Sequence, residues 1–277
     1  MIPPSKHLLY EHSVQSPRWQ VEYLPQVHRL LTGRNALRFR EDFCGSGKIA
    51  CEWVKKSSRH FAQGLDLDDE VLAYANEVNR AALDPKAQTR MEFLKKNVLT
   101  ARNGDFDWIG AFNFSFYIFH ERAQLLKYAR SAYRALASSG TFYLEMAGGF
   151  GFTEPFQDEK KVKVPGVGAV QQIWEQHGFD PISAVGDYSI HFQLPDGQWL
   201  NDAFTYHWRI WALREVREIL VEAGFDETVV LWEKPNRKGE GSGEFEIRED
   251  AEQMASWVAY IVGVKKPKSR RPQRKRP

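Results

Sequence analysis

A glycine turn followed by a carboxylate constrains this sequence more than any other feature. Gly45 and Gly47 follow a short run that begins at Ala36, and Asp66 ends a second run nineteen residues beyond Gly47. Glycine has no Cβ, so a turn that contains it can take positive φ angles and let a ligand approach its backbone amides. In a nucleotide-binding βαβ unit, a carboxylate at this spacing accepts hydrogen bonds from ribose hydroxyls. The pattern predicts a site for a ligand that contains a nucleoside.

The residues around the turn leave two kinds of nucleoside ligand open. Gly45, Gly47 and Ala50 match the loose G-x-G-x-x-G/A pattern of dinucleotide-binding enzymes. However, Glu41 and Asp42 directly precede the turn, and such carboxylates repel a pyrophosphate but attract a sulfonium and an ammonium. A NAD-dependent oxidoreductase therefore stays an alternative that the acidic pair disfavours.

Two stretches resemble motif I and its successor in the class I S-adenosylmethionine (SAM) dependent methyltransferases. They are the run from Glu41 to Gly47, Glu-Asp-Phe-Cys-Gly-Ser-Gly, and the run from Gly64 to Asp68, Gly-Leu-Asp-Leu-Asp. The resemblance covers residues 37–146 and resumes over 210–264, with Phe43 standing where the superfamily usually has its first glycine. It implies a Rossmann-like enzyme that uses SAM as its cofactor.

The hydrophobic pattern predicts an α/β fold. Five predicted strands alternate with helices as far as residue 146, 228–233 is a sixth and 257–264 the predicted last, so we expect a doubly wound, mostly parallel seven-stranded sheet with an antiparallel last strand. Between them, residues 160–178, 184–194 and 199–211 alternate polar and apolar groups and predict an inserted antiparallel β meander rich in aromatic residues.

These patterns divide the chain into five parts. We expect a helical arm or lid (1–35), a SAM-binding core (36–147), the β insertion (148–211), the C-terminal part of the core (212–264) and a disordered basic tail (265–277). The insertion either roofs the cofactor cleft and shapes a substrate pocket or forms a homodimer interface. The tail carries eight basic residues and no acid, so it either contacts nucleic acid or another acidic partner or stays solvated.

The cofactor residues follow from the resemblance. It implies Glu41 and Gly45 near the methionine moiety, Asp66 on the ribose and Leu67 against adenine. Arg40 would pair with the methionine carboxylate, and the arm would lie over the cofactor. The predicted cofactor set is Tyr10, Trp19, Arg40, Glu41, Cys44, Gly45, Gly47, Asp66, Leu67, Asn97, Val98, Asn113 and Phe114.

Three of these predictions also rest on position and chemistry. Asn97 can accept one hydrogen bond from adenine through its amide oxygen, although it is equally typical of a turn. Asn113 and Phe114 end the predicted fourth strand, at the carboxyl edge where open α/β sheets bind ligands.

Methyl transfer from a sulfonium requires mainly alignment of the acceptor and exclusion of water, because the leaving group becomes neutral. An ammonium or hydroxyl acceptor would also need a general base, and we predict it among four residues. They are Tyr117, His120, Glu145 and His207. We expect a small-molecule or protein acceptor. An RNA methyltransferase that uses the basic tail and a non-catalytic SAM-binding protein stay as alternatives.

Cellular location and metal content are also constrained. No apolar run approaches 18 residues and the first residues do not form a signal peptide, so we expect no membrane association. Cys44 and Cys51 are the only cysteines, a pattern that indicates a reducing cytoplasm and gives no support for a metal site.

Overall fold

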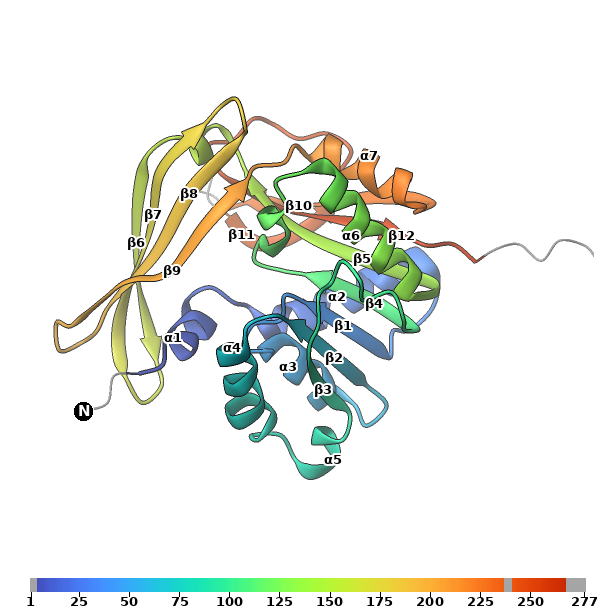
Figure 1. Ribbon diagram of the computed structural model, residues 1–277, viewed down its shortest axis with the longest axis horizontal. Helices are drawn as coiled ribbons and strands as arrows, with labels where there is room; N and C mark the ends of the chain where they lie inside the picture. Colours follow the sequence, from blue (N-terminus) through green and yellow to red (C-terminus); the bar gives the residue numbers. More distant parts are fainter. Residues whose placement is uncertain (1–3, 237–240, 268–277) are drawn as a thin grey trace, which may run out of the picture.

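Two β-sheets form the framework of the protein (Figure 1). The computed structural model describes residues 4–236 and 241–267. The larger sheet contains β1 (Arg38–Asp42), β2 (Phe61–Asp66), β3 (Met91–Lys95), β4 (Phe106–Ala111), β5 (Leu136–Gly148), β10 (Glu227–Pro235), β11 (Gly241–Ile247) and β12 (Trp257–Val264). The smaller sheet contains β6 (Phe156–Val164), β7 (Gly168–Asp180), β8 (Val185–Gln193) and β9 (Trp199–Arg209).

The larger sheet has the order β11-β10-β12-β5-β4-β1-β2-β3. β1 to β5 are parallel to their neighbours, whereas β12 pairs antiparallel with both β5 and β10. This arrangement confirms the predicted α/β class, with its mostly parallel seven-stranded sheet and antiparallel last strand. The strand β11 extends the sheet by one antiparallel edge strand, which the sequence analysis did not predict.

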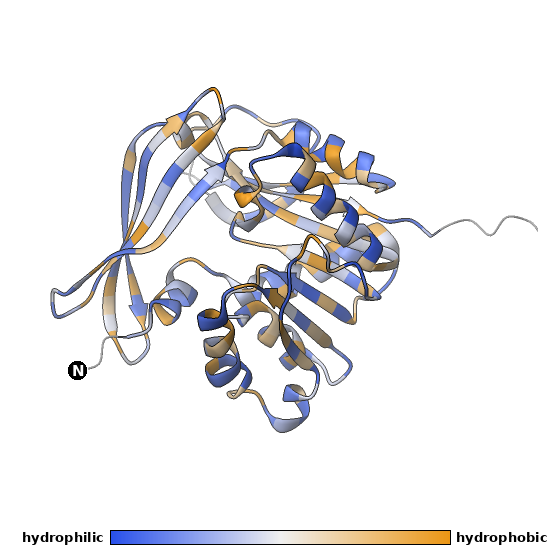
Figure 2. Ribbon diagram, in the orientation of Figure 1, coloured by the Kyte–Doolittle hydropathy of each residue, from blue (hydrophilic) through white to orange (hydrophobic). Residues whose placement is uncertain are grey.

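Helices cover both faces of the larger sheet. The helices that follow the strands of this sheet or pack on it are α2 (Pro17–Thr32), α3 (Lys48–Lys56), α4 (Asp69–Tyr74), the π-helix Ala75–Arg80, α5 (Pro85–Gln88), α6 (Arg122–Ala135) and α7 (Leu213–Ala223), whereas α1 (Lys6–Ser13) packs on the smaller sheet. Apolar residues of α2 and α3 pack on one face and those of α6 and α7 on the other. Figure 2 shows the hydrophobic residues gathered along the sheet and on the inward sides of these helices.

The alternation of side chains along each strand produces these two layers. Phe39 and Trp108 point toward α3 and stack with ring centroids 3.8 Å apart. Their chain neighbours point the opposite way, and Ile109 packs with the buried residues of α6. The strand ends are therefore held between two apolar layers.

The N-terminal arm contains two helices rather than the single amphipathic helix that its spacing predicted. α1 ends at Ser13, and Pro17 occupies the first turn of α2, where a missing N–H has no helical partner to lose. Gly33 ends α2 in the left-handed conformation with φ +71°. The break lets α1 point in a different direction from α2.

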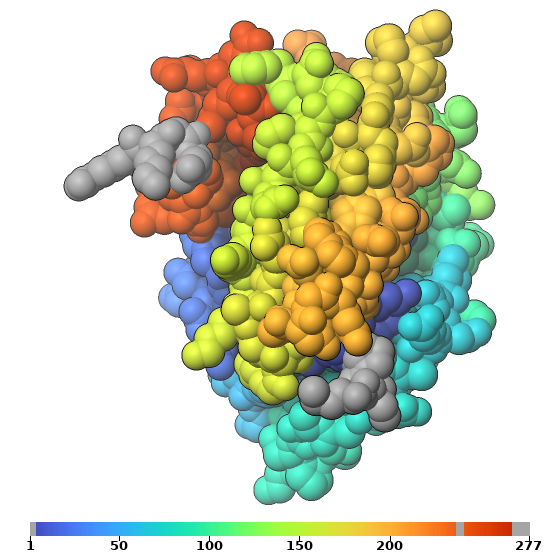
Figure 3. Space-filling view, turned by 90° about the vertical axis from the view of Figure 1, so that its left-hand side faces the viewer, coloured from blue at the N-terminus to red at the C-terminus, as the bar shows by residue number. Residues whose placement is uncertain are grey.

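The insertion is a four-stranded antiparallel sheet, and it occupies the centre of the view in Figure 3. The predicted segment 160–178 is divided between β6 and β7 by a turn in which Gly166 has φ +75°. Its inner face packs Ile190 and Phe192 against Leu9 of α1. Figure 1 shows this sheet beside α1 and away from the covered faces of the larger sheet.

The C-terminal end departs from the prediction of disorder from residue 265 onward. Lys265 donates to the carbonyl of Tyr133, and Lys266 forms an ion pair with Glu227 at 2.7 Å. The rest of the predicted tail, 268–277, lies outside the described residues. No helix among the described residues is long and apolar enough to cross a membrane.

Candidate active site

The glycine turn and the carboxylate that follows it lie in direct contact. Asp66 Oδ2 accepts a hydrogen bond from the Gly45 N–H at 2.8 Å, and Asp66 Oδ1 accepts one from the Leu67 N–H at 2.7 Å. The two residues end the adjacent parallel strands β1 and β2, whose tips are joined further by the Cys44 N–H donating to the Leu65 carbonyl. The glycine turn after β1 and the carboxylate at the end of β2, which the sequence pattern associates, are therefore in contact in the structure.

The turn requires glycine at Gly47 more strictly than at Gly45. Gly47 has φ +66°, and a Cβ placed there would lie 2.0 Å from the ring of Phe93. Gly45 has φ +51° with open space around it, so a ligand can approach its backbone. Cys44 is buried and free, and burial raises the pKa of its thiol well above the ordinary value.

Phe43 keeps the backbone path that a glycine would take at its position. Its φ is +56°, a left-handed conformation that is unfavourable for a bulky residue. Its ring packs edge-on against Phe119 and Tyr128, with centroids 5.8 and 5.6 Å away. These ring contacts hold the strained backbone in place, so Phe43 takes the left-handed conformation that glycine adopts readily.

The acidic pair before the turn separates into two different groups. Asp42 and Arg40 face α6, where Arg40 Nε lies 2.8 Å from Asp42 Oδ1 and Tyr128 donates to Asp42 at 2.8 Å. Arg40 is fully buried and also donates to the Ala101 carbonyl. Alternation along β1 therefore turns the Arg40 side chain into the core, where its predicted ligand carboxylate is replaced by Asp42.

Glu41 faces the opposite side of β1 and has no cationic partner among the described residues. Its Oε2 accepts the Ala50 N–H at 2.9 Å, in the first turns of α3. Burial, together with the nearby carboxylates of Asp66 and Asp42, raises the pKa of Glu41 to about 8. A positively charged ligand beside the turn would favour the ionised form of Glu41.

The residues predicted around adenine have different environments. Leu67 is 56% exposed and leaves an apolar side chain open beside Asp66. The amide oxygen of Asn97 accepts the Leu99 N–H at 2.9 Å, so the oxygen predicted to bind adenine is already used within a turn. Val98 is buried in the core with Leu65, which excludes its side chain from the surface of a ligand site.

A cleft of about 740 Å³ opens at the carboxyl ends of β4, β5 and β10, between the arm and the insertion, and its described lining includes neither Gly45 nor Asp66. It brings together five predicted residues from two parts of the chain, Tyr10 and Trp19 from the arm and Asn113, Phe114 and Glu145 from the core. Its charged groups are three carboxylates, Glu145, Asp158 and Glu233, and one amine, Lys160. The described lining therefore has a net negative charge.

Aromatic rings form the wall that the insertion contributes to the cleft. Tyr206 and Trp208 stack with centroids 4.2 Å apart, and Trp174 lies 6.2 Å from Tyr206. On the opposite wall, Trp19 of α2 stacks on Tyr260 at 5.9 Å. The predicted roof of aromatic residues therefore lies over a cavity that is large enough for a small molecule.

The loop after β4 has an unusual backbone at the floor of the cleft. Asn113 and Phe114 both have positive φ, +52° and +57°. Glu145 holds this loop by accepting the Asn113 N–H at 2.6 Å, and it accepts the Tyr260 hydroxyl at 2.8 Å. Burial raises the pKa of the Glu145 carboxyl. Strained residues of this kind occur where surrounding structure fixes a functional geometry.

Three of the four predicted bases lie away from the cleft. Tyr117 is fully buried, and its hydroxyl donates to the Ala147 carbonyl at 2.7 Å. His120 and His207 meet each other instead, with His120 Nε2 2.8 Å from the His207 carbonyl and their rings 4.9 Å apart. They line a separate hollow with Asp187. The structure therefore places none of these three residues in the lining of the cleft, and of the four predicted bases only Glu145 lines it.

Sequence reasoning missed two of the carboxylates in the cleft. Glu233 lies near the carboxyl end of β10 and accepts the Gly243 N–H of β11 at 2.7 Å. A strand-end position in a sheet of parallel strands was the available signal for this residue. Asp158 lies on the edge strand β6 of the insertion, and no pattern distinguishes it from other surface acids of that strand.

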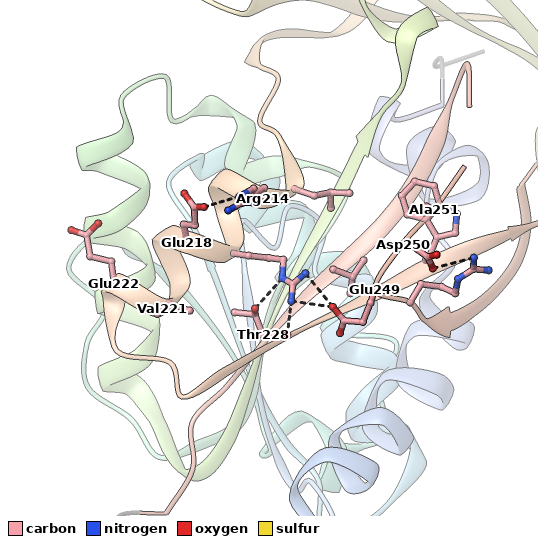
Figure 4. A pocket seen from close by; sticks show the side chains of 13 residues that line it. Arg214, Glu218, Val221, Glu222, Thr228, Glu249, Asp250 and Ala251 are labelled. Atoms are coloured by element: carbon pink, nitrogen blue, oxygen red, sulfur yellow. Dashed lines mark hydrogen bonds and ion pairs between the residues drawn. The ribbon is translucent and has the colours of Figure 1, made fainter. Parts of the chain in front are cut away.

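A second hollow, between α7 and β10, does not have the features of a catalytic site (Figure 4). It contains none of the predicted site residues, and its charged groups pair with one another or, for Glu222, with Arg122 and Arg130 outside the hollow. Arg217 donates to Thr228 at 3.1 Å and lies 3.4 Å from Glu249, while Arg214 pairs with Glu218 at 2.9 Å. These pairs leave no uncompensated charge to attract a polar ligand.

Comparison with known proteins identifies similar structures but no similar sequence. No family model and no curated protein matches the chain. The SAM-bound amino pentose methyltransferase CalS10 from Micromonospora echinaspora has 14% identity and a TM-score of 0.66, over 96% of this chain and 98% of that chain. DesVI from Streptomyces venezuelae has 15% identity and a TM-score of 0.67, over 95% and 97%.

A third structure extends the same likeness. The sugar N-methyltransferase KedS8 from Streptoalloteichus has 15% identity and a TM-score of 0.66, over 96% of this chain and 94% of that chain. The likeness therefore spans both sheets, not the parallel core alone. It confirms the Rossmann-like methyltransferase fold that the motif resemblance implied.

Proposed function

We propose that this protein is a SAM-dependent methyltransferase whose acceptor is an amine of a small molecule. The observation that carries the proposal is the contact between Gly45 and Asp66 at the same carboxyl edge of the sheet where the ends of β4 and β5 line a negatively charged aromatic cleft. The turn suits a nucleoside, and the cleft suits a cationic acceptor beside it. SAM, when bound, supplies a methyl group activated by its attachment to a positively charged sulfur.

The residues of the turn fit SAM chemically. Asp66 Oδ1 accepts the backbone N–H groups of Leu67 and Asp68, whereas Oδ2 accepts only that of Gly45 and has a further lone pair for a ribose hydroxyl. The open side chain of Leu67 provides an apolar surface for a flat base. Glu41, buried without a cationic partner among the described residues, suits the positive sulfur and ammonium of the donor.

The same turn disfavours a dinucleotide. A pyrophosphate in a Rossmann enzyme binds the free N–H groups at the N-terminus of the first helix. Here Glu41 accepts the Ala50 N–H and holds a carboxyl group at that end of α3. Asp42 no longer contributes to this argument, because Arg40 neutralises it within the core. The case against NAD therefore rests on Glu41.

The lining of the cleft supports an amine acceptor. Aromatic faces attract cations, most strongly when water is excluded, and the rings of Trp174, Tyr206 and Trp208 form one wall. Three carboxylates against one lysine would repel the phosphates of RNA. An amino pentose methyltransferase and a sugar N-methyltransferase are among the similar structures, which supports an acceptor of the size of an amino sugar.

Glu145 is the group that we propose as general base. An amine must be neutral to attack, and the nitrogen loses a proton after it gains the methyl group. Glu145 lines the cleft at the end of β5, where its raised pKa suits it to accept that proton. The aromatic walls exclude water, and Asn113 and Phe114 set the floor on which the acceptor would lie.

A binding panel tests the proposal. SAM and S-adenosylhomocysteine should each raise the Tm of the wild-type protein, and NAD should not. Incubation with SAM and a set of amines, including glucosamine, should then give a methylated product detectable by mass spectrometry. Stabilisation by NAD alone would overturn the proposal.

A cytoplasmic location stays a prediction of the sequence.

A further inference from the structure

The helix α1 contacts the SAM-binding core with one face and the inserted sheet with the opposite face. In Figure 1 it lies between the four-stranded sheet and α4. His7 and Glu11, one turn apart, face the SAM-binding core. Leu9, on the other side of the helix, is fully buried against Ile190 and Phe192 of the insertion. A single short helix thus connects two parts of the chain that are distant in sequence.

A buried polar cluster ties α1 to the glycine turn. Asn79 Nδ2 donates to Glu11 Oε1 at 2.6 Å and to the carbonyl of Ser46, inside the turn, at 2.9 Å. Lys48 Nζ donates to Asn79 Oδ1 at 2.9 Å and lies 3.5 Å from Glu11 Oε2. Glu11 is 6% exposed and Asn79 4%. A charge buried to this degree is destabilising unless it is paired.

The π-helix Ala75–Arg80 supplies the central residue of this cluster. The sequence pattern predicts one continuous α-helix over residues 69–83, but the chain changes to π geometry at Ala75. Turns of this kind are rare and occur frequently at functional sites. Here the π-helix carries Asn79, which contacts both Glu11 and the glycine turn.

The other contacts of α1 complete the wall of the cleft. Tyr10 lines the cleft, its ring lies 4.8 Å from Phe204 of β9, and its hydroxyl hydrogen-bonds with Tyr206. If α1 left its place, the cleft would lose Tyr10, and Tyr206 would lose its partner. We call Tyr10, Tyr206 and Trp208 the acceptor wall, because their side chains line the cleft in which the acceptor would bind. The position of α1 therefore sets the shape of the acceptor wall, while Glu11 of the same helix contacts the glycine turn through Asn79.

We propose that Glu11, Asn79 and Lys48 form a latch that holds α1 between the glycine turn and the cleft. Through this latch, binding of the donor at the turn is coupled to formation of the acceptor wall in the cleft. This inference rests on the proposed function, because it assigns the turn to a donor. A donor that orders the Ser46 carbonyl would strengthen the docking of α1 through Asn79. Coupling between two sites is reciprocal, so removal of the latch should weaken donor binding as well as loosen the wall.

The test compares Glu11→Ala with Glu22→Ala. Glu22 is a matched control because it is an exposed acid on the adjacent helix whose ion pair, with Lys56 at 3.3 Å, lies on the surface. Hydrogen exchange is measured over α1, over residues 204–208 and over α6, and the Kd of S-adenosylhomocysteine is measured by calorimetry. Glu11→Ala should speed exchange in α1 and in 204–208 but not in α6, and it should weaken binding by about tenfold, which is 1.4 kcal/mol.

Glu22→Ala should leave both measurements unchanged. Equal results for the two variants would overturn the latch. Faster exchange in α1 with an unchanged Kd would also overturn it, because α1 would then serve the fold alone. Wild-type protein that fails to bind S-adenosylhomocysteine would instead overturn the proposed donor, whereas the exchange data test the latch whatever the wild type binds. Should Glu11→Ala fail to fold, Glu11→Gln retains an acceptor for Asn79 and should give a smaller change in the same direction.

Discussion

The Asp66 carboxylate accepts the backbone N–H of Gly45 at 2.8 Å. This bond joins the ends of two adjacent parallel strands and places the carboxylate beside backbone that a ligand can approach. Asp66 is thereby oriented before any ligand binds, which reduces the entropy that binding must overcome.

Gly47→Ala should destabilise the protein by about 2–4 kcal/mol. The new Cβ would meet Phe93 at 2.0 Å, and overpacking costs about 1–3 kcal/mol in addition to about 1 kcal/mol for the left-handed backbone. Gly45→Ala is the matched control, since it has positive φ but open space, and should lose only about 1 kcal/mol. Urea unfolding of both variants measures the difference, and equal losses would contradict the clash with Phe93.

Glu41→Gln should stabilise the protein more at high pH than at low pH. Burial raises the pKa of Glu41 from 4.5 to about 8, so the folded state holds a proton that the unfolded state releases. The stability from this group is fully present below 4.5 and is lost as pH rises through about 8. Glutamine keeps an acceptor for Ala50 without the buried charge, so the variant should melt several degrees above wild type at pH 9, since 1 kcal/mol corresponds to about 2–4 °C. At pH 5 the two proteins should melt together, and a difference in Tm that did not depend on pH would contradict the assignment.

Tyr117→Phe and Glu145→Gln should separate stability from catalysis. Loss of the Tyr117 hydroxyl leaves the Ala147 carbonyl, its acceptor, without that partner, so we expect a loss of about 1–3 kcal/mol in stability with little change in methyl transfer. Glu145→Gln keeps an acceptor for the Asn113 N–H but cannot take a proton, so the rate should fall by about 10²-fold. His120→Ala is the control, because His120 lies outside the cleft. Normal turnover by Glu145→Gln would exclude its role as base.

The sequence determines the parallel core well because its signals are local. The alternation of Phe39 and Arg40, the glycines and the strand-end Asp66 all depend on residues close in the chain. Phe43 shows the limit of this reasoning. Its left-handed backbone is held by the rings of Phe119 and Tyr128, which lie far along the chain.

Roles that depend on distant contacts could not be predicted. Arg40 and Glu41 are neighbours, yet their opposite faces of β1 give one a place in the core and the other a place at the turn. His120 and His207 have the chemistry of catalytic bases, but the packing of the insertion places them outside the cleft. The latch of Glu11 and Asn79 joins residues 68 positions apart through a π-helix that no pattern predicted.

Calorimetric titration of Asp66→Ala with SAM tests the central claim most directly. Wild-type protein should bind SAM, and the variant should show no measurable binding because the ribose hydroxyls lose their acceptor. Asp68→Ala serves as the control, since Asp68 caps α4 through the Glu70 N–H and should change stability but not affinity. Undiminished affinity in Asp66→Ala would show that the glycine turn of this chain does not hold the donor.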